Sequence, residues 1–248
     1  MAKNKVTLKV SQLLKTFGGL SAVDRVDFSL QHGVLTALIG PNGAGKTTLF
    51  NLIGGLLTPT SGHVFFNDRD ITGLSPDKIS HMGIARTLQI TSIFQGLTTF
   101  ENIWVAAQSR KRFFNPFIQS TKLRDVEATV RDLLERFWLS NKAETLASDL
   151  SHGDQRLLEI AIALATKPSL VLLDEPTSGL SEVETDSVKM AIKDLIQELD
   201  ILLVEHNMDV VMGIADQVIV LDNGNIIASG TPDQISKNEQ VQKVYFGR

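Results

Sequence analysis

One segment of nine residues constrains the fold of this chain more than any other. It reads Gly40-Pro41-Asn42-Gly43-Ala44-Gly45-Lys46-Thr47-Thr48. The spacing G-x-x-x-x-G-K-[ST] lets backbone N–H groups turn inward around an anion, and a following helix points its positive dipole end at the same place. A nearly continuous apolar run, residues 34–39, precedes the segment, and a helical pattern, residues 46–57, follows it. The segment therefore indicates a phosphate-binding loop between a buried strand and a helix.

Two side chains of this loop have defined chemistry. Lys46 would reach the β and γ phosphates of a nucleotide, and the Thr47 hydroxyl would bind Mg²⁺. A glycine-rich turn with an incidental lysine is the alternative interpretation. The four fixed positions of the motif, together with the strand before it and the helix after it, favour the phosphate site.

Polar residues also follow two other buried strands. The apolar runs 170–173 and 201–204 are typical of strands buried on both faces of a parallel sheet. Asp174 and Glu175 follow the first run, and His206 follows the second. Because ligands bind at the carboxyl edge of such sheets, we expect Asp174 to hold Mg²⁺, Glu175 to orient or deprotonate an attacking water, and His206 to lie beside them. A solvated acidic pair and a structural histidine are the alternatives.

The remaining patterns predict two kinds of subdomain. Alternating polar and apolar residues predict antiparallel strands, and an Asn-Gly turn predicts a hairpin between residues 218–221 and 226–229. The antiparallel strands are expected at residues 6–10, 26–30 and 63–67. Residues 90–166 contain helical patterns, with Thr98 and Ser151 as N-caps, and no convincing strand. A capping box of Ser181 and Glu184 opens a later helix.

We therefore predict an α/β P-loop NTPase core with a parallel sheet, an N-terminal antiparallel β-subdomain and an inserted α-helical subdomain. The core is expected to span residues 1–89 and 167–248 and the helical subdomain residues 90–166, all within a single domain. The 248 residues contain no cysteine and carry a net charge of −4, which argues against thiolate metal sites and against nucleic acid as a partner. The sequence shows no signal-peptide pattern and no apolar run of about 18 residues, so we expect that this chain does not cross a membrane.

A second anion site is predicted at the start of another helix. The residues Leu150-Ser151-His152-Gly153-Asp154-Gln155 lie some 20 residues before the acidic pair. They resemble the signature Leu-Ser-Gly-Gly-Gln of ABC ATPases, in which Ser151 and the amide of Gly153 would contact nucleotide. Taken alone, the segment is also compatible with an ordinary N-cap.

The resemblance to ABC ATPases extends over essentially the whole chain. It implies that Phe17 stacks on adenine, that Gln89 reaches Mg²⁺ and links to the helical subdomain, and that His206 is the switch histidine. It also implies that residues 178–181 form the D-loop. A core aromatic is the alternative for Phe17. His152, Asp154 and Ser181 depart from the usual pattern and affect the expected geometry of dimer contacts.

Within this family the chain resembles the branched-chain amino-acid (Liv-type) importer ATPases. The suggestive segments are residues 17–20, 83–87, 110–122, 204–208 and 244–247. Urea-type import and lipopolysaccharide-export ATPases share parts of this pattern. The resemblance implies ATP and Mg²⁺ as cofactors and an ATPase subunit at the cytoplasmic face of the membrane, peripheral to it and soluble when isolated.

The resemblance also implies partners. Because the chain has one P-loop and one signature, a head-to-tail dimer with an identical or related ATPase subunit is expected. Transmembrane permease subunits would dock near Gln89 and the helical subdomain, and a substrate-binding protein would complete the importer. The basic cluster 110–114 is interpreted as a solvated surface rather than a membrane contact. Rival functions are a P-loop kinase, a non-transport ABC ATPase and a regulatory module that binds nucleotide without hydrolysis.

Overall fold

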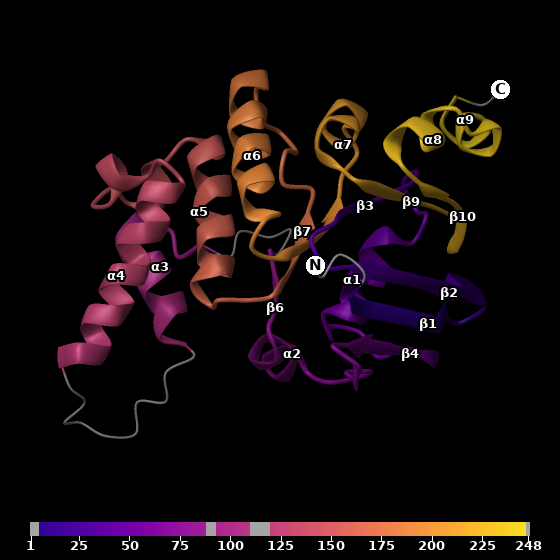
Figure 1. Cartoon of the computed structure of the whole chain (residues 1–248), viewed down its shortest axis with the longest axis horizontal. Coiled ribbons are helices and arrows are strands. Elements are labelled where there is room, and N and C mark those ends of the chain that lie inside the picture. The colour runs from indigo at the N-terminus through magenta and orange to yellow at the C-terminus, as the bar shows by residue number, and fades with distance from the viewer. Residues whose placement is uncertain (1–4, 88–92, 110–119, 247–248) are drawn as a thin grey trace. The chain divides into compact units, whose positions relative to one another are not determined.

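The chain forms two compact units, seen in the computed structural model of Figure 1. The structure describes residues 5–87, 93–109 and 120–246. Residues 1–86, 169–176 and 195–248 make up the first unit, here called the α/β unit. Residues 87–168 and 177–194 make up the second, here called the helical unit.

A six-stranded sheet forms the centre of the α/β unit, with the strand order β10-β9-β3-β8-β7-β6. Strands β3, β6, β7, β8 and β9 pair in parallel, and β10 pairs antiparallel to β9. Their bounds are β3 Leu35–Ile39, β6 Ile84–Arg86, β7 Leu170–Asp174, β8 Asp200–Val204, β9 Gln217–Asp222 and β10 Asn225–Gly230. Every residue of β3, β7 and β8 is buried, which confirms the three apolar runs as central strands.

A second, antiparallel sheet with the order β2-β1-β4-β5 confirms the predicted N-terminal β-subdomain (Figure 1). Its strands are β1 Val6–Phe17, β2 Leu20–Gln31, β4 Ser61–Phe66 and β5 Arg69–Asp70. Strands β1 and β2 are longer than predicted because they continue into a twisted hairpin with several register shifts. Helix α1 (Lys46–Ile53) buries Leu49, Phe50 and Ile53 in a core shared by residues of both sheets.

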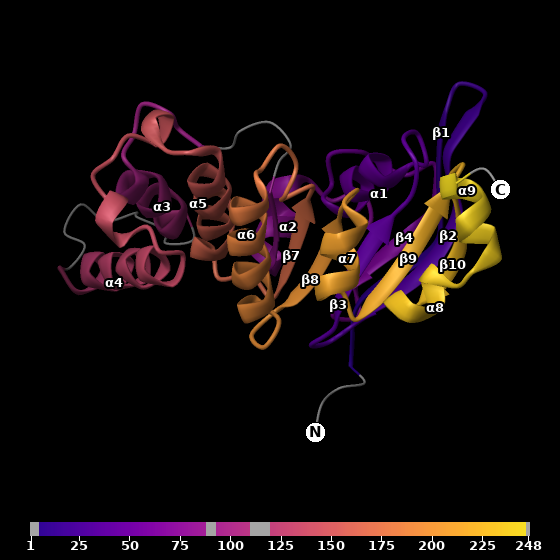
Figure 2. The same ribbon diagram turned by 90° about the horizontal axis from the view of Figure 1, so that it is seen from above.

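The carboxyl-terminal part of the chain packs on the end of the six-stranded sheet. The turn between β9 and β10 has positive φ at Asn223 (46°) and Gly224 (77°), as a type I′ turn requires, so the predicted hairpin is confirmed. Figure 2 shows α8 (Pro232–Ser236) and α9 (Glu239–Phe246) beside β10. Helix α7 (Met208–Ile214) follows β8, and α2 (Pro76–Met82) precedes β6.

The helical unit is built from four helices and two short 3₁₀ turns among its described residues. The helices are α3 Thr99–Gln108, α4 Ser120–Arg136, α5 His152–Ala165 and α6 Glu182–Leu195, and the turns are η1 Ser140–Lys142 and η2 Ala147–Asp149. Thr98 and Glu101 form a full capping box, and the Ser151 hydroxyl caps α5, as the sequence predicts. In the described part of residues 90–166, strand-like pairing is limited to an isolated bridge between Thr98 and Leu146.

Several element boundaries differ from the predicted ones. Helix α1 ends at Ile53 rather than at residue 57, because Gly54 and Gly55 follow and Gly55 adopts a positive φ of 75°. Strand β6 and helices α2, α8 and α9 were not predicted. Residues 177–194 group with the helical unit, whereas the predicted core included them. The division of one ATPase domain into a core and a helical subdomain stays a prediction.

Some of the residues named in the sequence analysis could not be compared with the structure. Gln89 and the basic cluster 110–114 lie outside the described residues. Among the helices that are described, none is both long enough and apolar enough to span a membrane.

Candidate functional site

The loop between β3 and α1 is held tightly by its surroundings. Gly40 and Gly45 have positive φ values of 157° and 104°. A Cβ atom on Gly40 would lie 2.1 Å from the Leu221 carbonyl oxygen, and one on Gly45 would lie 2.2 Å from that of Ala22. Backbone from β9 and β2 therefore fills the space where side chains would be, so glycine is required at both positions.

Lys46 lies inside this loop. Its Nζ donates to the carbonyl oxygens of Gly40 (2.6 Å) and Pro41 (3.0 Å), and the residue is 6% exposed. Burial lowers the pKa of the Lys46 ammonium, while the nearby carboxylates of Glu175 and Asp174 act in the opposite direction. The lysine is thus positioned by the backbone of the loop, within range of an anion that the loop would hold.

Asp174 ends β7 and is bound by a buried arginine. Nη2 of Arg86, the last residue of β6, lies 2.9 Å from Oδ2 of Asp174. Nη1 of the same guanidinium donates to Oδ1 of Asn51 on α1 at 2.7 Å, and the group lies 5.6 Å from the centre of the Phe50 ring. Arg86 therefore joins β6, β7 and α1 beneath the loop. Sequence reasoning missed this role; the available signal was a charged residue at the end of a buried strand.

Glu175 and His206 contact each other at the same edge of the sheet. Nε2 of His206 lies 2.5 Å from Oε1 of Glu175, and the backbone N–H of Glu175 donates to Val204 of β8. Glu175 has a positive φ of 50°, which turns its side chain out of the strand path. The Glu205 carboxylate accepts from the N–H groups of His206 and Asn207 and fixes this second loop.

The parallel register accounts for this convergence. Val204 pairs with Asp174 on one side and with Leu38 on the other, so the ends of β7, β8 and β3 lie level. The loop of residues 40–48 and the side chains of Asp174, Glu175 and His206 consequently lie at one edge, as the sequence predicts.

Phe17 ends β1 in an exposed position. Its side chain is 47% exposed, and Nζ of Lys15 lies 5.0 Å from the ring centre. A core aromatic residue would be buried, so this alternative interpretation of Phe17 is wrong. Stacking of its ring on adenine stays a proposal.

Tyr245 of α9 was not expected beside the phosphate-binding loop. Burial raises the pKa of the Tyr245 hydroxyl to about 12, against the opposing effect of a hydrogen bond with the backbone of Gly40. The last helix of the chain therefore contributes to the wall of this loop.

The signature residues lie in the helical unit. The Ser151 hydroxyl accepts from the N–H of Asp154 (3.2 Å) and donates to its carboxylate (2.9 Å), and Nζ of Lys142 lies 2.5 Å from the same carboxylate. The N–H of Gly153 donates to Oε1 of Glu184 at 3.0 Å. Both groups predicted to contact nucleotide are therefore engaged by carboxylates of this chain.

The residues at the sheet edge fit a nucleotide with a magnesium ion. The glycine cradle suits phosphate oxygens, and Asp174 and Thr47 offer the oxygen ligands that Mg²⁺ prefers. Among the described residues, no group of three or more His, Cys, Asp or Glu side chains could hold a metal ion.

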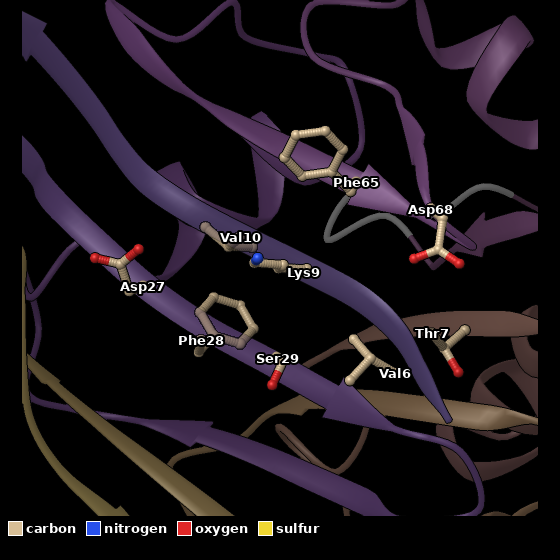
Figure 3. Close-up of a pocket in the computed structure, with 9 residues that line it drawn as sticks. All are labelled: Val6, Thr7, Lys9, Val10, Asp27, Phe28, Ser29, Phe65 and Asp68. Atoms are coloured by element: carbon tan, nitrogen blue, oxygen red, sulfur yellow. The ribbon is translucent and has the colours of Figure 1, made fainter. Parts of the chain in front are cut away.

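A separate hollow of about 610 Å³ lies on the antiparallel sheet (Figure 3). Nine residues of β1, β2, β4 and the turn after β4 line it: Val6, Thr7, Lys9, Val10, Asp27, Phe28, Ser29, Phe65 and Asp68. It contains none of the predicted site residues. We assign the nucleotide to the sheet edge because the convergent polar groups are there.

These features define a class of protein. A sequence model of the family described as "ABC transporter" matches residues 23–178, and the chain belongs to this family as an ATP-binding, ATP-hydrolysing subunit. A second model, "Branched-chain amino acid ATP-binding cassette transporter", matches residues 225–248.

Particular relatives are similar over nearly their full length. The chain is 40% identical to the high-affinity branched-chain amino acid transport ATP-binding protein LivG of Escherichia coli, with 97% of each chain covered. It is 38% identical to BraF of Pseudomonas aeruginosa, with the same coverage, and 32% identical to the lipopolysaccharide export ATP-binding protein LptB of Escherichia coli, again with 97% of each covered. The ADP conformation of the ATP-binding cassette MJ1267 matches with a TM-score of 0.86 at 30% identity, covering 99% of this chain and 100% of that one.

Proposed function

We propose that this subunit hydrolyses MgATP as half of a dimer and powers the import of branched-chain amino acids through separate permease subunits. The observation that carries the catalytic part is the contact of 2.5 Å between Glu175 and His206 beside the loop that holds Lys46. It supplies a carboxylate base, oriented by an imidazole, at the edge where the phosphates would lie.

Each residue has a role in this proposal. The loop of residues 40–48 binds the phosphates, and Phe17 stacks on the base. Asp174 and Thr47, together with Gln89 outside the described residues, would hold Mg²⁺, and the ion would neutralise charge on the phosphates. Glu175 accepts a proton from the attacking water, and His206 keeps the Glu175 carboxylate in position.

We infer a dimer because each chain supplies a single P-loop and a single signature segment. One P-loop and one signature occur in the sequence, so Ser151 and Gly153 of one subunit would close over nucleotide held by the P-loop of a second. The partner is an identical or related ATPase subunit. A substrate-binding protein and a peripheral place at the cytoplasmic membrane face belong to the same proposal.

The substrate class rests on similarity along the chain. LivG and BraF are named for branched-chain amino acid transport, and the second family match covers the carboxyl-terminal segment. Similarity to LptB, at 32%, favours lipopolysaccharide export as the second candidate. Uptake of labelled leucine by liposomes that contain the cognate membrane subunits and binding protein separates the two.

Hydrolysis and pairing are tested together by steady-state ATPase rates over a series of protein concentrations. We expect the rate per subunit to rise with concentration and Glu175→Gln to reduce kcat by roughly 10²–10⁴-fold. Glu182→Gln, which removes the same charge at an exposed position, is the control and should keep the wild-type rate. A rate that is independent of concentration and survives Glu175→Gln would reject the mechanism.

A further inference from the structure

The first turns of α5 and α6 are joined through one carboxylate within the helical unit. Oε1 of Glu184 accepts from the N–H of Gly153 at 3.0 Å. Oε2 of the same carboxylate accepts from the N–H of Ser181 at 3.0 Å and from its hydroxyl at 2.7 Å. Glu184 thus completes the capping box of α6 and, with its other oxygen, also caps the signature helix.

The Glu184 carboxylate also packs closely against the backbone of Gly153. A Cβ atom on Gly153 would lie 2.7 Å from Cγ of Glu184 and 2.9 Å from its Oε1. The Glu184 side chain therefore lies directly over the Gly153 backbone, and a larger residue at position 153 would have to displace it. The hydrogen bonds from Ser181, then that from Gly153, lower the pKa of Glu184 to about 2, so the group is an anion at neutral pH.

We propose that Glu184 is a positioning residue of the composite ATP site: its carboxylate occupies the Gly153 N–H in the unpaired subunit and must give it up to the nucleotide of the partner subunit. This inference rests on the proposed function. It assigns to Glu184 a role in setting how much ATP is needed for two subunits to pair.

The direction of the effect follows from charge. One backbone N–H cannot make a full hydrogen bond with a carboxylate and with a phosphate oxygen at the same time, and the two anions repel each other. A hydrogen bond to a charged acceptor is about twice as strong as one to a neutral acceptor. Glutamine at this position preserves the capping box and removes the charge. Glu184→Gln should therefore make the Gly153 N–H more available to the phosphate of the partner subunit's nucleotide.

The test measures pairing in a background that cannot hydrolyse ATP. All variants carry Glu175→Gln, and sedimentation at increasing MgATP gives the ATP concentration at which half of the protein is dimeric. We expect Glu184→Gln to lower that concentration roughly tenfold, because a hydrogen bond to a charged acceptor is stronger than one to a neutral acceptor. Glu182→Gln, an exposed acid in the same turn, should leave it unchanged.

Two further measurements separate competition from other effects. Glu184→Asp keeps the charge but shortens the reach to Gly153, so competition predicts that it behaves like Glu184→Gln. Binding of fluorescent ATP to the monomer should stay at the Glu175→Gln value in both variants, because it does not depend on the partner's nucleotide.

Each alternative outcome has a distinct meaning. If Glu175→Gln alone does not dimerise with MgATP, the proposed function fails. If it does dimerise and Glu184→Gln leaves the ATP requirement unchanged or raises it, the role of Glu184 is rejected while the proposed function stands. If Glu184→Asp behaves like the unsubstituted residue, surface charge and not the Gly153 contact accounts for the effect, and the inference is also rejected.

Discussion

At the scale of single residues, the clearest feature is a buried ion pair under the phosphate-binding loop. The Arg86 side chain is 11% exposed, and that of Asp174 is fully buried. Removing the cation would break this ion pair at a carboxylate that is shielded from solvent.

We therefore expect Arg86→Met to lower the free energy of unfolding by about 3–5 kcal/mol, because removing one partner of a buried ion pair is strongly destabilising. Urea denaturation measures this. Arg131→Met is the control: Arg131 is 70% exposed and pairs with Glu127 one helical turn away, so its removal should cost no more than about 0.5 kcal/mol. Equal effects of the two substitutions would contradict the structural importance of Arg86.

Glu184 gives a prediction of pH dependence. Its pKa falls from 4.5 to about 2, mainly through the hydrogen bonds from Ser181. A carboxyl group with a lowered pKa in the folded state stabilises that state above the unfolded pKa and loses this contribution as the pH falls. We expect wild type and Glu184→Gln to differ in stability by a constant amount above about pH 5 and by less and less toward pH 3. A constant difference over the whole range would contradict the assigned contacts.

At the scale of elements, the hairpin between β9 and β10 supports the phosphate-binding loop. The N–H of Gly224 donates to the carbonyl of Ala44 (2.9 Å), and its carbonyl accepts from the N–H of Asp24 (2.8 Å). Gly224 thus forms backbone hydrogen bonds with both the phosphate-binding loop and β2. The left-handed conformation of Gly224 is required for these contacts.

Gly224→Ala should lower stability by about 1–2 kcal/mol, since a non-glycine residue in the left-handed region is strained. Its new Cβ would also lie 3.1 Å from the Ala22 carbonyl oxygen. Gly19→Ala is a matched control because Gly19 has no positive φ and open space around it, and its effect should stay within about 0.5 kcal/mol. Thermal unfolding of both variants measures the difference, and a neutral Gly224→Ala would refute the strain argument.

The sequence predicts elements well where one local pattern determines them. Nearly continuous apolar runs identify β3, β7 and β8, and the Asn-Gly turn identifies the last hairpin. The end of α1 was predicted too late because Leu56 and Leu57 prolong the apolar pattern past Gly54 and Gly55. Contacts between distant segments could not be predicted: Glu184 and Gly153 are 31 residues apart, and neither has a local signal that points to the other.

At the scale of the whole molecule, the described residues of the proposed nucleotide site divide unequally between the two units. The phosphate-binding loop, Asp174, Glu175 and His206 all belong to the α/β unit, and the signature belongs to the helical unit. A single subunit with nucleotide bound at its own P-loop should therefore be stabilised mainly in the α/β unit.

We expect MgADP, at about 100 times its dissociation constant, to stabilise the folded α/β unit by about 2.7 kcal/mol. Hydrogen exchange should then slow in β3 and α1, with a smaller change in α4 of the helical unit. Lys46→Ala, which removes the phosphate contact, is the control and should abolish the difference. If MgADP slowed hydrogen exchange equally in both units at low protein concentration, where dimers are absent, the two units would unfold together and the expectation would be wrong.

The contact of Tyr245 with Gly40 has a spectroscopic consequence. Tyr245 is the single tyrosine of the chain, and it lies in the α/β unit, while both tryptophans, Trp104 and Trp138, lie in the helical unit. Fluorinated tyrosine would therefore give one ¹⁹F resonance, placed beside the phosphate-binding loop, and tryptophan emission would report on the other unit. The sequence thus offers one probe position for the α/β unit and two for the helical unit, and no residue has to be substituted by mutation.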